Sequence, residues 1–260
     1  MTAGPATPGS TDRVDLVAYT LRLGDDTLVF SQRLGEWIAA SPQLEQDVAI
    51  GNIALDLLGQ ARALLSYAGA VEGRGRDEDV LAYFRDERDF TNVHLVEGAS
   101  RGDFAITMAR LLVFASYQHQ LYGRLAGSSD ETLAAIAAKA VKEVDYHRDH
   151  ATQWVLRLGD GTQESHRRMQ AALDAVWPDL DELFESDDLV RRLPGVAVDP
   201  ADLEQPVRGY LRQVLDRATL TVPDVRPAVT GGRRGIHSEV MGFLLAEMQH
   251  LARSHPGAQW

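Results

Sequence analysis

The sequence predicts an all-α fold: a long four-helix bundle followed by additional C-terminal helices. Three observations predict this. Apolar residues recur at intervals of three and four positions along most of the chain. Four of these segments are roughly 25 residues long and are joined by short loops, as in an up-and-down bundle. No segment shows the alternation of apolar and polar residues that is typical of a half-buried strand.

The first two helices of the expected bundle cover residues 14–40 and 42–69. In the first, the run Gly24-Asp25-Asp26 interrupts the apolar pattern, and either aspartate is a candidate cap for a continuation. Ser41-Pro42 opens the second helix, because proline is favoured in the first turn, where its missing N–H is not needed. The pattern of the second helix stops near Gly69.

The third and fourth helices have clear start signals. Asp103 is the expected N-cap of a helix that ends at Gly127, and Asp130 is the expected N-cap of a helix that ends at Gly159. The remaining third of the chain is also helical in pattern. We expect its helices at about residues 162–185, 202–218 and 237–253, with a Pro/Gly-rich loop over residues 223–235.

Composition limits the possible functions. The chain has 26 Lys and Arg against 38 Asp and Glu, a net charge of −12 that argues against nucleic-acid and anionic-membrane partners. It contains no cysteine, which excludes disulfides, thiolate-bound clusters and a cysteine nucleophile. No stretch approaches the 18 uninterrupted apolar residues of a transmembrane helix. We therefore expect a cytoplasmic protein.

The domain organisation follows from the same patterns. Residues 1–12 are small, polar and rich in Pro and Gly, and they lack the basic and apolar regions of a signal peptide. We expect a disordered leader over residues 1–12 and a single helical domain over residues 13–260.

A long four-helix bundle raises the question of a di-iron centre. Ferritin-like carboxylate proteins place a Glu on two core helices and Glu-x-x-His on the other two, because residues three apart share a helix face. Of the histidines in this chain, only His250 has a carboxylate three positions earlier, at Glu247. That pair lies in the last predicted helix, and we interpret it as part of a solvated face.

Polar residues nevertheless occur inside the apolar core helices. Asn52, Asp56 and Gln60 form a stripe at i, i+4 and i+8 on the second helix, and Glu143 and His147 lie one turn apart on the fourth. These groups are costly to bury unless they bond to one another. Two interpretations compete: a metal site with irregular ligands, or a polar network that replaced a metal or faces solvent. We favour the second, because Asn and Gln are poor iron ligands.

Two further segments carry candidate chemistry. The turn Gly231-Gly232-Arg233-Arg234-Gly235 could hold an anion such as a phosphate group, but an exposed basic turn is the interpretation we favour. Tyr117, Gln118 and His119 cluster on the third helix. No dinucleotide, P-loop or serine-hydrolase motif is present.

Four blocks of the sequence resemble a known family. They are AYTLRLGDDTLVFSQRLGEWIAASPQLEQDVAIGNIALDLLGQAR (Ala18 to Arg62), DERDFTNVHLVE (Asp86 to Glu97), AAKAVKEVDYH (Ala137 to His147) and LAEMQHLARSHPGAQW (Leu245 to Trp260). In these blocks and in their order the chain resembles the C subunits of ring 1,2-phenylacetyl-CoA epoxidases.

The resemblance implies membership of a bacterial multicomponent monooxygenase of phenylacetate catabolism. In that family the A subunit holds the di-iron centre and binds the CoA thioester. A separate reductase component contains flavin and an iron–sulfur cluster and uses NADPH. The C subunit has a ferritin-like fold, holds no cofactor and pairs with A as a non-catalytic structural partner. No iron ligand of A can be assigned here, because Asp56, Gly59 and Tyr146 occupy the corresponding positions.

The resemblance also directs attention to partner-binding residues. The candidates are outward-facing apolar residues of the first two helices and the C-terminal tail with Met248, Leu251 and Trp260. The alternative function is an autonomous ferritin-like di-metal enzyme with the irregular ligands Asp56, Glu143 and His147.

Overall fold

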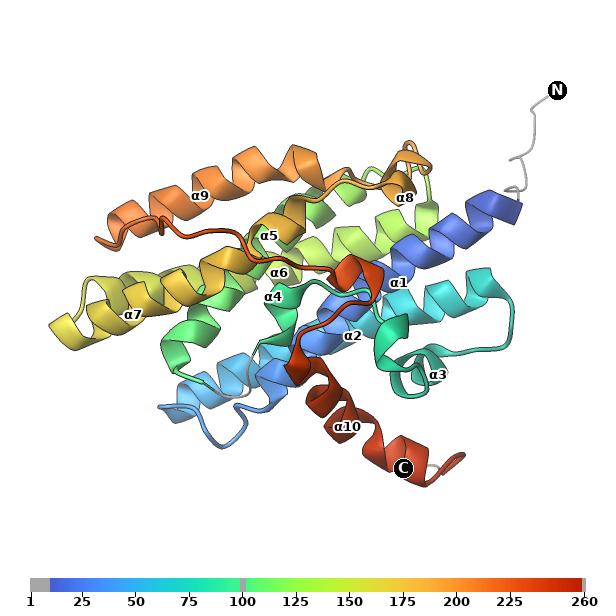
Figure 1. Ribbon diagram of the computed structural model, residues 1–260, viewed down its shortest axis with the longest axis horizontal. Helices are drawn as coiled ribbons and strands as arrows, with labels where there is room; N and C mark the ends of the chain where they lie inside the picture. The colour runs from blue at the N-terminus through green and yellow to red at the C-terminus, as the bar shows by residue number, and fades with distance from the viewer. Residues whose placement is uncertain (1–9, 99–101, 259–260) are drawn as a thin grey trace.

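The computed structural model describes residues 10–98 and 102–258, and these residues form helices and loops without strands. The all-α prediction is therefore confirmed (Figure 1). The helices are α1 (Ser10–Gly35), α2 (Leu44–Glu72), α3 (Glu78–Tyr83), η1 (Glu87–Asp89), α4 (His94–Glu97), α5 (Phe104–Leu125), α6 (Glu131–Gly159), α7 (Gln163–Val176), η2 (Trp177–Asp179), η3 (Asp181–Phe184), α8 (Asp188–Arg191), η4 (Pro200–Leu203), α9 (Glu204–Arg217), η5 (Gly232–Arg234) and α10 (Glu239–Ser254).

Two long helix pairs build the bundle. Helix α1 packs along α2, helix α5 packs along α6, and α2 contacts α6 to join the pairs. The core is aromatic where α1 meets α5, since the rings of Phe30 and Phe114 lie edge to face with centroids 5.1 Å apart. At Gly24 the first pair is in close contact: a Cβ there would lie 2.9 Å from Leu65 Cδ2. The glycine thus permits α1 and α2 to approach closely.

Side-chain caps fix the ends of the second pair and of the helix that follows it. Asp103 accepts a hydrogen bond from the amide of Ala105, and Asp130 accepts one from the amide of Leu133. Thr162 caps α7 in the same way through the amide of Ser165. The two predicted caps, Asp103 and Asp130, are confirmed, and Thr162 is a third cap at the predicted start of its helix. In each case an oxygen at the N-cap satisfies an amide that the helix leaves without a partner.

The C-terminal third wraps around the bundle. Helices α7 and α9 pack against α5 and α6, and an extended segment then crosses the front of the molecule to η5 and α10 (Figure 1). Helix α10 packs against α3, where Gln249 Nε2 donates hydrogen bonds to the carbonyls of Ala82 and Arg85 at 3.1 and 3.0 Å. The last helix is thereby held by backbone groups of the α3 region.

The structure corrects two boundaries near the N-terminus. Helix α1 runs through Gly24-Asp25-Asp26 without a break, so neither aspartate is a cap. Both carboxylates instead have partners far along the chain, described below. The leader expected at residues 1–12 falls mostly outside the described residues, and α1 begins at Ser10, before the expected boundary.

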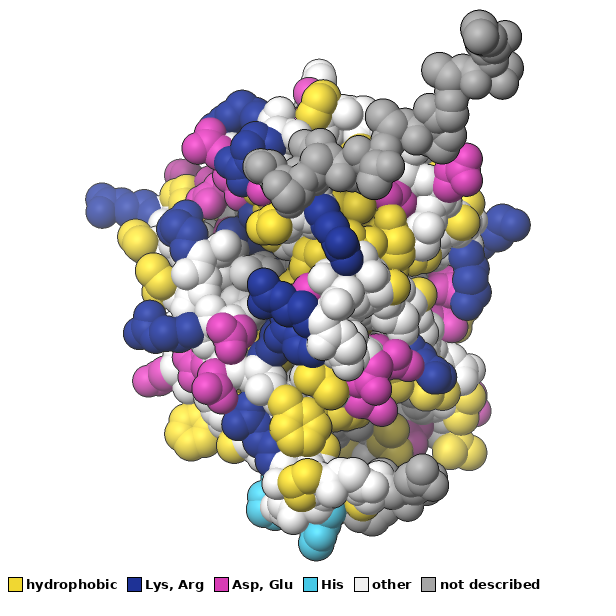
Figure 2. All heavy atoms as spheres, turned by 90° about the vertical axis from the view of Figure 1, so that its right-hand side faces the viewer, with side chains coloured by type: hydrophobic (Ala, Val, Ile, Leu, Met, Phe, Trp, Pro, Cys, Tyr) yellow, Lys and Arg dark blue, Asp and Glu magenta, His cyan; other side chains and the backbone are white. Residues whose placement is uncertain are grey.

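Among the described helices, α2 has the length and apolar composition of a membrane-spanning segment. One face of α2 is buried against the rest of the bundle, as in the core helix of a globular domain. Figure 2 shows the end of the molecule where α1 starts, and there Lys and Arg intermingle with Asp and Glu without forming a continuous basic patch.

Candidate functional site

Two polar pairs connect α2 and α6 at the middle of the bundle. His147 Nε2 lies 3.0 Å from Asp56 Oδ2, and Gln60 Nε2 donates to Glu143 Oε2 at 3.0 Å. Lys139 Nζ approaches the other oxygen of Glu143 at 3.5 Å. Four of the five polar residues singled out in the sequence are thus brought together, as two adjacent pairs.

The environment of His147 favours a neutral imidazole. Its side chain is fully buried, while that of Asp56 is 37% exposed. Burial lowers the pKa of His147, and the nearby carboxylates of Asp56 and Glu143 only partly oppose that effect. Its Nδ1 atom has no hydrogen-bond partner in the described structure. This histidine therefore holds the two helices in register through one nitrogen.

Asn52 lies outside this group. It is exposed, although the sequence placed it in one stripe with Asp56 and Gln60. Four residues turn an α-helix by slightly more than one full turn, so a stripe at i, i+4 and i+8 drifts around the helix by roughly 80° from end to end. Gln60 at one end of the stripe is buried, and Asn52 at the other end faces solvent.

The donor set at the middle of the bundle does not fit a di-iron centre. Across residues 10–98 and 102–258, no group of three or more His, Asp or Glu side chains is placed to hold a metal ion. Asp56 and Glu143 each face a nitrogen donor of the opposite helix instead of a shared point. Two carboxylates used in separate hydrogen-bonded pairs cannot bridge two irons, which need several inward carboxylates and imidazoles together.

A buried charged core, not predicted from the sequence, surrounds the middle of α1. Asp25 pairs with Arg85, which donates to both carboxylate oxygens. Asp26 pairs with Arg233 through two hydrogen bonds of 3.0 and 2.8 Å. Burial alone would lower the pKa of Arg233, but the Asp26 carboxylate outweighs it and raises that pKa. The guanidinium is therefore charged inside the protein.

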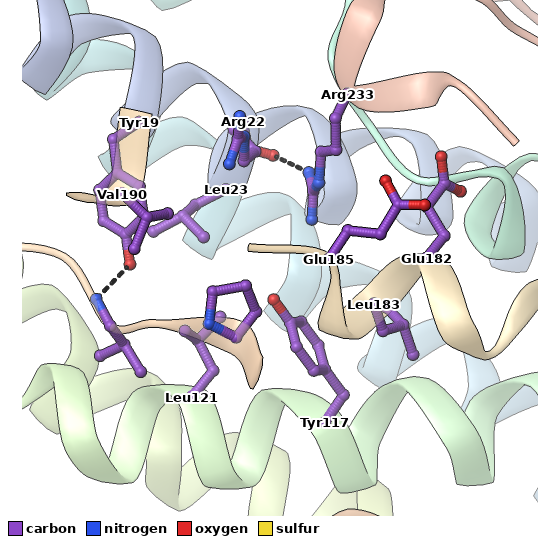
Figure 3. Close-up of a pocket in the computed structure, with 12 residues that line it drawn as sticks. Tyr19, Arg22, Leu23, Tyr117, Leu121, Glu182, Leu183, Glu185, Val190 and Arg233 are labelled. Atoms are coloured by element: carbon purple, nitrogen blue, oxygen red, sulfur yellow. Dashed lines mark hydrogen bonds between the residues drawn. The ribbon is translucent and has the colours of Figure 1, made fainter. Parts of the chain in front are cut away.

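Arg233 also borders a small cavity (Figure 3). It donates to the carbonyl of Arg22 at 3.4 Å, and the hydroxyl of Tyr117 points toward its guanidinium. Burial raises the pKa of Tyr117 to about 12, so the phenol is neutral. The cavity holds about 10 Å³, close to the space of one water molecule, and excludes a larger ligand.

This arrangement corrects the interpretation of the Gly231–Gly235 turn. Arg233 points inward and is bound to Asp26, so the turn is neither an exposed basic turn nor an anion site built on that arginine. Only Arg234 is exposed, 3.6 Å from Glu185. A Cβ at Gly232 would lie 2.0 Å from the carbonyl oxygen of Asn92, so the glycine is required for the turn to dock.

A second buried acid–base pair lies beside this turn. The side chains of Glu97 and His237 are fully buried, with Oε1 and Nδ1 2.6 Å apart. The other ring nitrogen of His237 lies 3.0 Å from the carbonyl oxygen of Phe90, and Ser238 donates its amide to Glu97 at 2.8 Å. Burial opposes charge on the imidazole, but Glu97 outweighs burial and raises the pKa of His237. Because both ring nitrogens face acceptors, the imidazolium satisfies them best.

Comparison with known proteins places the chain in a family. The family model described as phenylacetic acid catabolic protein matches residues 1–260. The C subunit of the 1,2-phenylacetyl-CoA epoxidase of Escherichia coli strain K12 is 49% identical over 247 residues, which cover 94% of this chain and 99% of that protein. The chain belongs to the phenylacetic acid catabolic protein family. The family is ferritin-like, so the resemblance and fold class predicted from the sequence are both confirmed.

The three partner-binding residues predicted in the C-terminal tail differ in their exposure to solvent. On α10, Leu251 is exposed and Met248 is half-buried against the core, while Trp260 lies outside the described residues. Phe243, which the sequence pattern did not single out, is an aromatic residue of the same helix and is 77% exposed. Glu247 and His250 are also exposed. Helix α10 therefore offers a mixed apolar and polar outer face.

The cluster Tyr117-Gln118-His119 is divided by the structure. Tyr117 joins the charged core, and Gln118 is buried with its Oε1 atom unpartnered in the described structure. His119 points toward α6, where its Nδ1 lies 3.0 Å from Arg148 Nη1. Consecutive residues on a helix point about 100° apart, which explains why the three do not form one site.

Proposed function

We propose that this chain is a non-catalytic structural component of a 1,2-phenylacetyl-CoA epoxidase. It would support the di-iron A subunit, which epoxidises the aromatic ring of phenylacetyl-CoA with O2 in aerobic phenylacetate catabolism. Similarity to the C subunit of the Escherichia coli epoxidase supports membership of such a complex. The observation that carries the non-catalytic role is the use of Asp56, Gln60, Glu143 and His147 in two hydrogen-bonded pairs where metal ligands would be needed.

The cofactors of the reaction belong to other subunits in this proposal. The di-iron centre lies in the A subunit, and the flavin, iron–sulfur cluster and NADPH site belong to the reductase. The absence of cysteine in this chain supports the assignment of the iron–sulfur cluster elsewhere. The enzyme complex would work in the cytoplasm.

Metal analysis tests the proposal. The purified chain is loaded with ferrous iron under anaerobic conditions, desalted and analysed for iron, with the A subunit treated in parallel as the positive control. We expect the chain to retain no stoichiometric iron. About two irons per chain, lost in Asp56→Ala and His147→Ala, would instead establish the alternative, an autonomous di-metal enzyme.

Reconstitution tests the structural role. We expect epoxidase activity from the A subunit and reductase to depend on added chain, and to be restored equally by wild type and by His147→Gln that has kept its fold. Full activity of the other subunits without this chain would contradict the proposal.

A further inference from the structure

The small cavity beside Arg233 lies where α1, α5 and the C-terminal third of the chain meet (Figure 3). Its volume of about 10 Å³ is close to the smallest space that can hold one water molecule. Its polar lining comes from four helices: Tyr19 and Arg22 of α1, Tyr117 of α5, Glu182 of η3 and Arg233 of η5. A buried water needs about two to four polar partners, and this lining can supply them.

One atom of Arg22 has a hydrogen to donate and no described acceptor for it. The Arg22 side chain is 9% exposed, and its Nη2 atom donates to Asp187 Oδ2. Its Nε atom is buried and has no hydrogen-bond partner among the described residues. A buried N–H of a charged group is costly to leave unpaired, so we expect an acceptor beside Nε.

Two buried tyrosine hydroxyls in the lining offer further hydrogen bonds. Tyr19 accepts a hydrogen bond from the amide of Val198 at 3.1 Å, which leaves its own hydrogen for another acceptor. The Tyr117 hydroxyl points from α5 toward Arg233 (Figure 3). Burial raises the pKa of Tyr19 and raises the pKa of Tyr117 to about 12, so both phenols keep their protons. Each hydroxyl can therefore both donate and accept.

The charges around the cavity favour a neutral occupant. Arg22 pairs with Asp187, Arg233 pairs with Asp26, and Glu182 adds a third carboxylate. These five side chains leave one negative charge, which disfavours an anion. The two guanidiniums disfavour a metal ion, and nowhere in residues 10–98 and 102–258 do three or more His, Asp or Glu side chains converge to hold one. Water is neutral and can both donate and accept.

We propose that this cavity is a binding site for a single water molecule, which accepts a hydrogen bond from Arg22 Nε and exchanges one with the hydroxyl of Tyr117. The water connects α1 to α5 and extends the charged core from the Asp26–Arg233 pair to the Arg22–Asp187 pair. This proposal goes beyond the structural role argued above and does not depend on it.

A crystal structure of the purified chain, at a resolution that shows ordered water, is the first test. We expect one water about 2.7–3.2 Å from both Arg22 Nε and Tyr117 Oη. A second crystal is soaked in sodium bromide, because bromide gives an anomalous signal that water does not, and we expect no bromide in the cavity. A bromide peak there would overturn the proposal in favour of an anion site. Missing density in the cavity, where other buried waters of the same crystal are clear, would also overturn it.

Filling the cavity tests the site in solution. Val190 lines the cavity, and Val190→Ile adds one methyl group to the wall. That methyl displaces the water and leaves Arg22 Nε without an acceptor, so we expect the melting temperature to fall by at least about 2 °C. Magnetic relaxation dispersion of the water oxygen should count one long-lived water fewer. Val141→Ile, on α6 and outside the cavity lining, is the control and should keep the water.

A cavity without water predicts the opposite result, because an added methyl would fill space and raise the melting temperature. A raised melting temperature of Val190→Ile, or an unchanged number of long-lived waters, would overturn the proposal.

Tyr117→Phe is a second variant, needed if Val190→Ile does not fold. It removes one partner of the water, and we expect the long-lived water to be lost or to exchange faster. Tyr122→Phe is its control, since Tyr122 is a buried α5 tyrosine outside the cavity lining. Equal water relaxation in the two variants would contradict the proposal. These measurements need neither iron nor other subunits, so their outcome is independent of the metal and reconstitution tests.

Discussion

Asp26 and Arg233, 207 positions apart in the sequence, form a two-point contact inside the protein, with N–O distances of 3.0 and 2.8 Å. The contact ties the middle of the first helix to the turn that precedes the last one. Arg233 also donates to the carbonyl of Thr91 at 2.9 Å, so three distant segments meet at one guanidinium. The charged core therefore joins the first helix, the segment before α4 and the turn that precedes α10.

Neutralising Asp26 should destabilise the protein strongly. Asp26→Asn leaves the Arg233 charge buried without its partner, and breaking a buried pair in this way typically costs about 3–5 kcal/mol. Urea unfolding followed by circular dichroism measures the free energy of unfolding. Asp188→Asn is the control, because its ion pair with Arg191 is exposed, and it should change stability by less than about 1 kcal/mol. Equal effects of the two changes would contradict the role assigned to the core.

Asp56→Ala should lower the melting temperature. It removes the partner of buried His147, and an unpaired buried polar group typically costs about 1–3 kcal/mol. The reconstituted complex should keep its activity per assembled complex. Lys142→Ala on the exposed side of α6 is the control. A normal melting temperature together with lost activity would indicate a chemical role for Asp56.

The pair of Glu97 and His237 should make stability depend on pH. The pKa of His237 is raised above its usual value of 6.5, so the folded protein binds a proton more tightly than the unfolded chain. The contribution of the protonated His237 to the free energy of unfolding is complete below pH 6.5, and it is lost as the pH rises through the pKa of His237 in the folded protein. The stability difference between wild type and His237→Gln should therefore shrink from about pH 5.5 to 8.5.

Urea unfolding across that range measures the effect, with His250→Gln on the exposed face of α10 as the control. A difference for His237→Gln that is constant with pH, or that grows toward high pH, would contradict a charged imidazole.

The outer face of α10 should bind the A-type subunit. Leu251→Glu should weaken co-elution with that partner by at least about tenfold without lowering the melting temperature, because Leu251 is exposed. Deleting the tail from Gln249 would be a poorer test, since Gln249 and Arg253 hold the α3 region and their loss would disturb the fold. Undiminished binding of Leu251→Glu would remove this face from the interface.

The sequence predicted helix starts well, because an N-cap residue bonds to an amide only a few positions away. Asp103, Asp130 and Thr162 cap helices within a few residues of themselves, so their roles can be recognised from neighbouring positions. The break predicted at Gly24-Asp25-Asp26 was wrong for the opposite reason. The partners that stabilise these carboxylates inside a helix are Arg85 and Arg233, and no local pattern shows which distant arginine will reach them.

The middle of the bundle was partly predictable. The turn-to-turn spacing of Glu143 and His147 showed that the two side chains share one face of their helix, but it could not show that this face meets α2 or which residue of α2 each one contacts. Glu97 and His237 were missed, because a lone acid and a lone histidine 140 residues apart carry no motif. The two residues come together only in the folded protein, where the segment before α10 packs against α4.

The contact between Asp26 and Arg233 has a consequence for synthesis on the ribosome. At about 5–20 residues per second, the arginine is added about 10–40 s after the aspartate. Until then Asp26 lacks its partner, and an unpaired carboxylate is costly to bury. We therefore expect that the hairpin of α1 and α2 does not reach its final packing alone. Translation therefore delivers the partner of Asp26 almost last, and we expect a nascent chain truncated before Arg233 to stay sensitive to proteases along its N-terminal half.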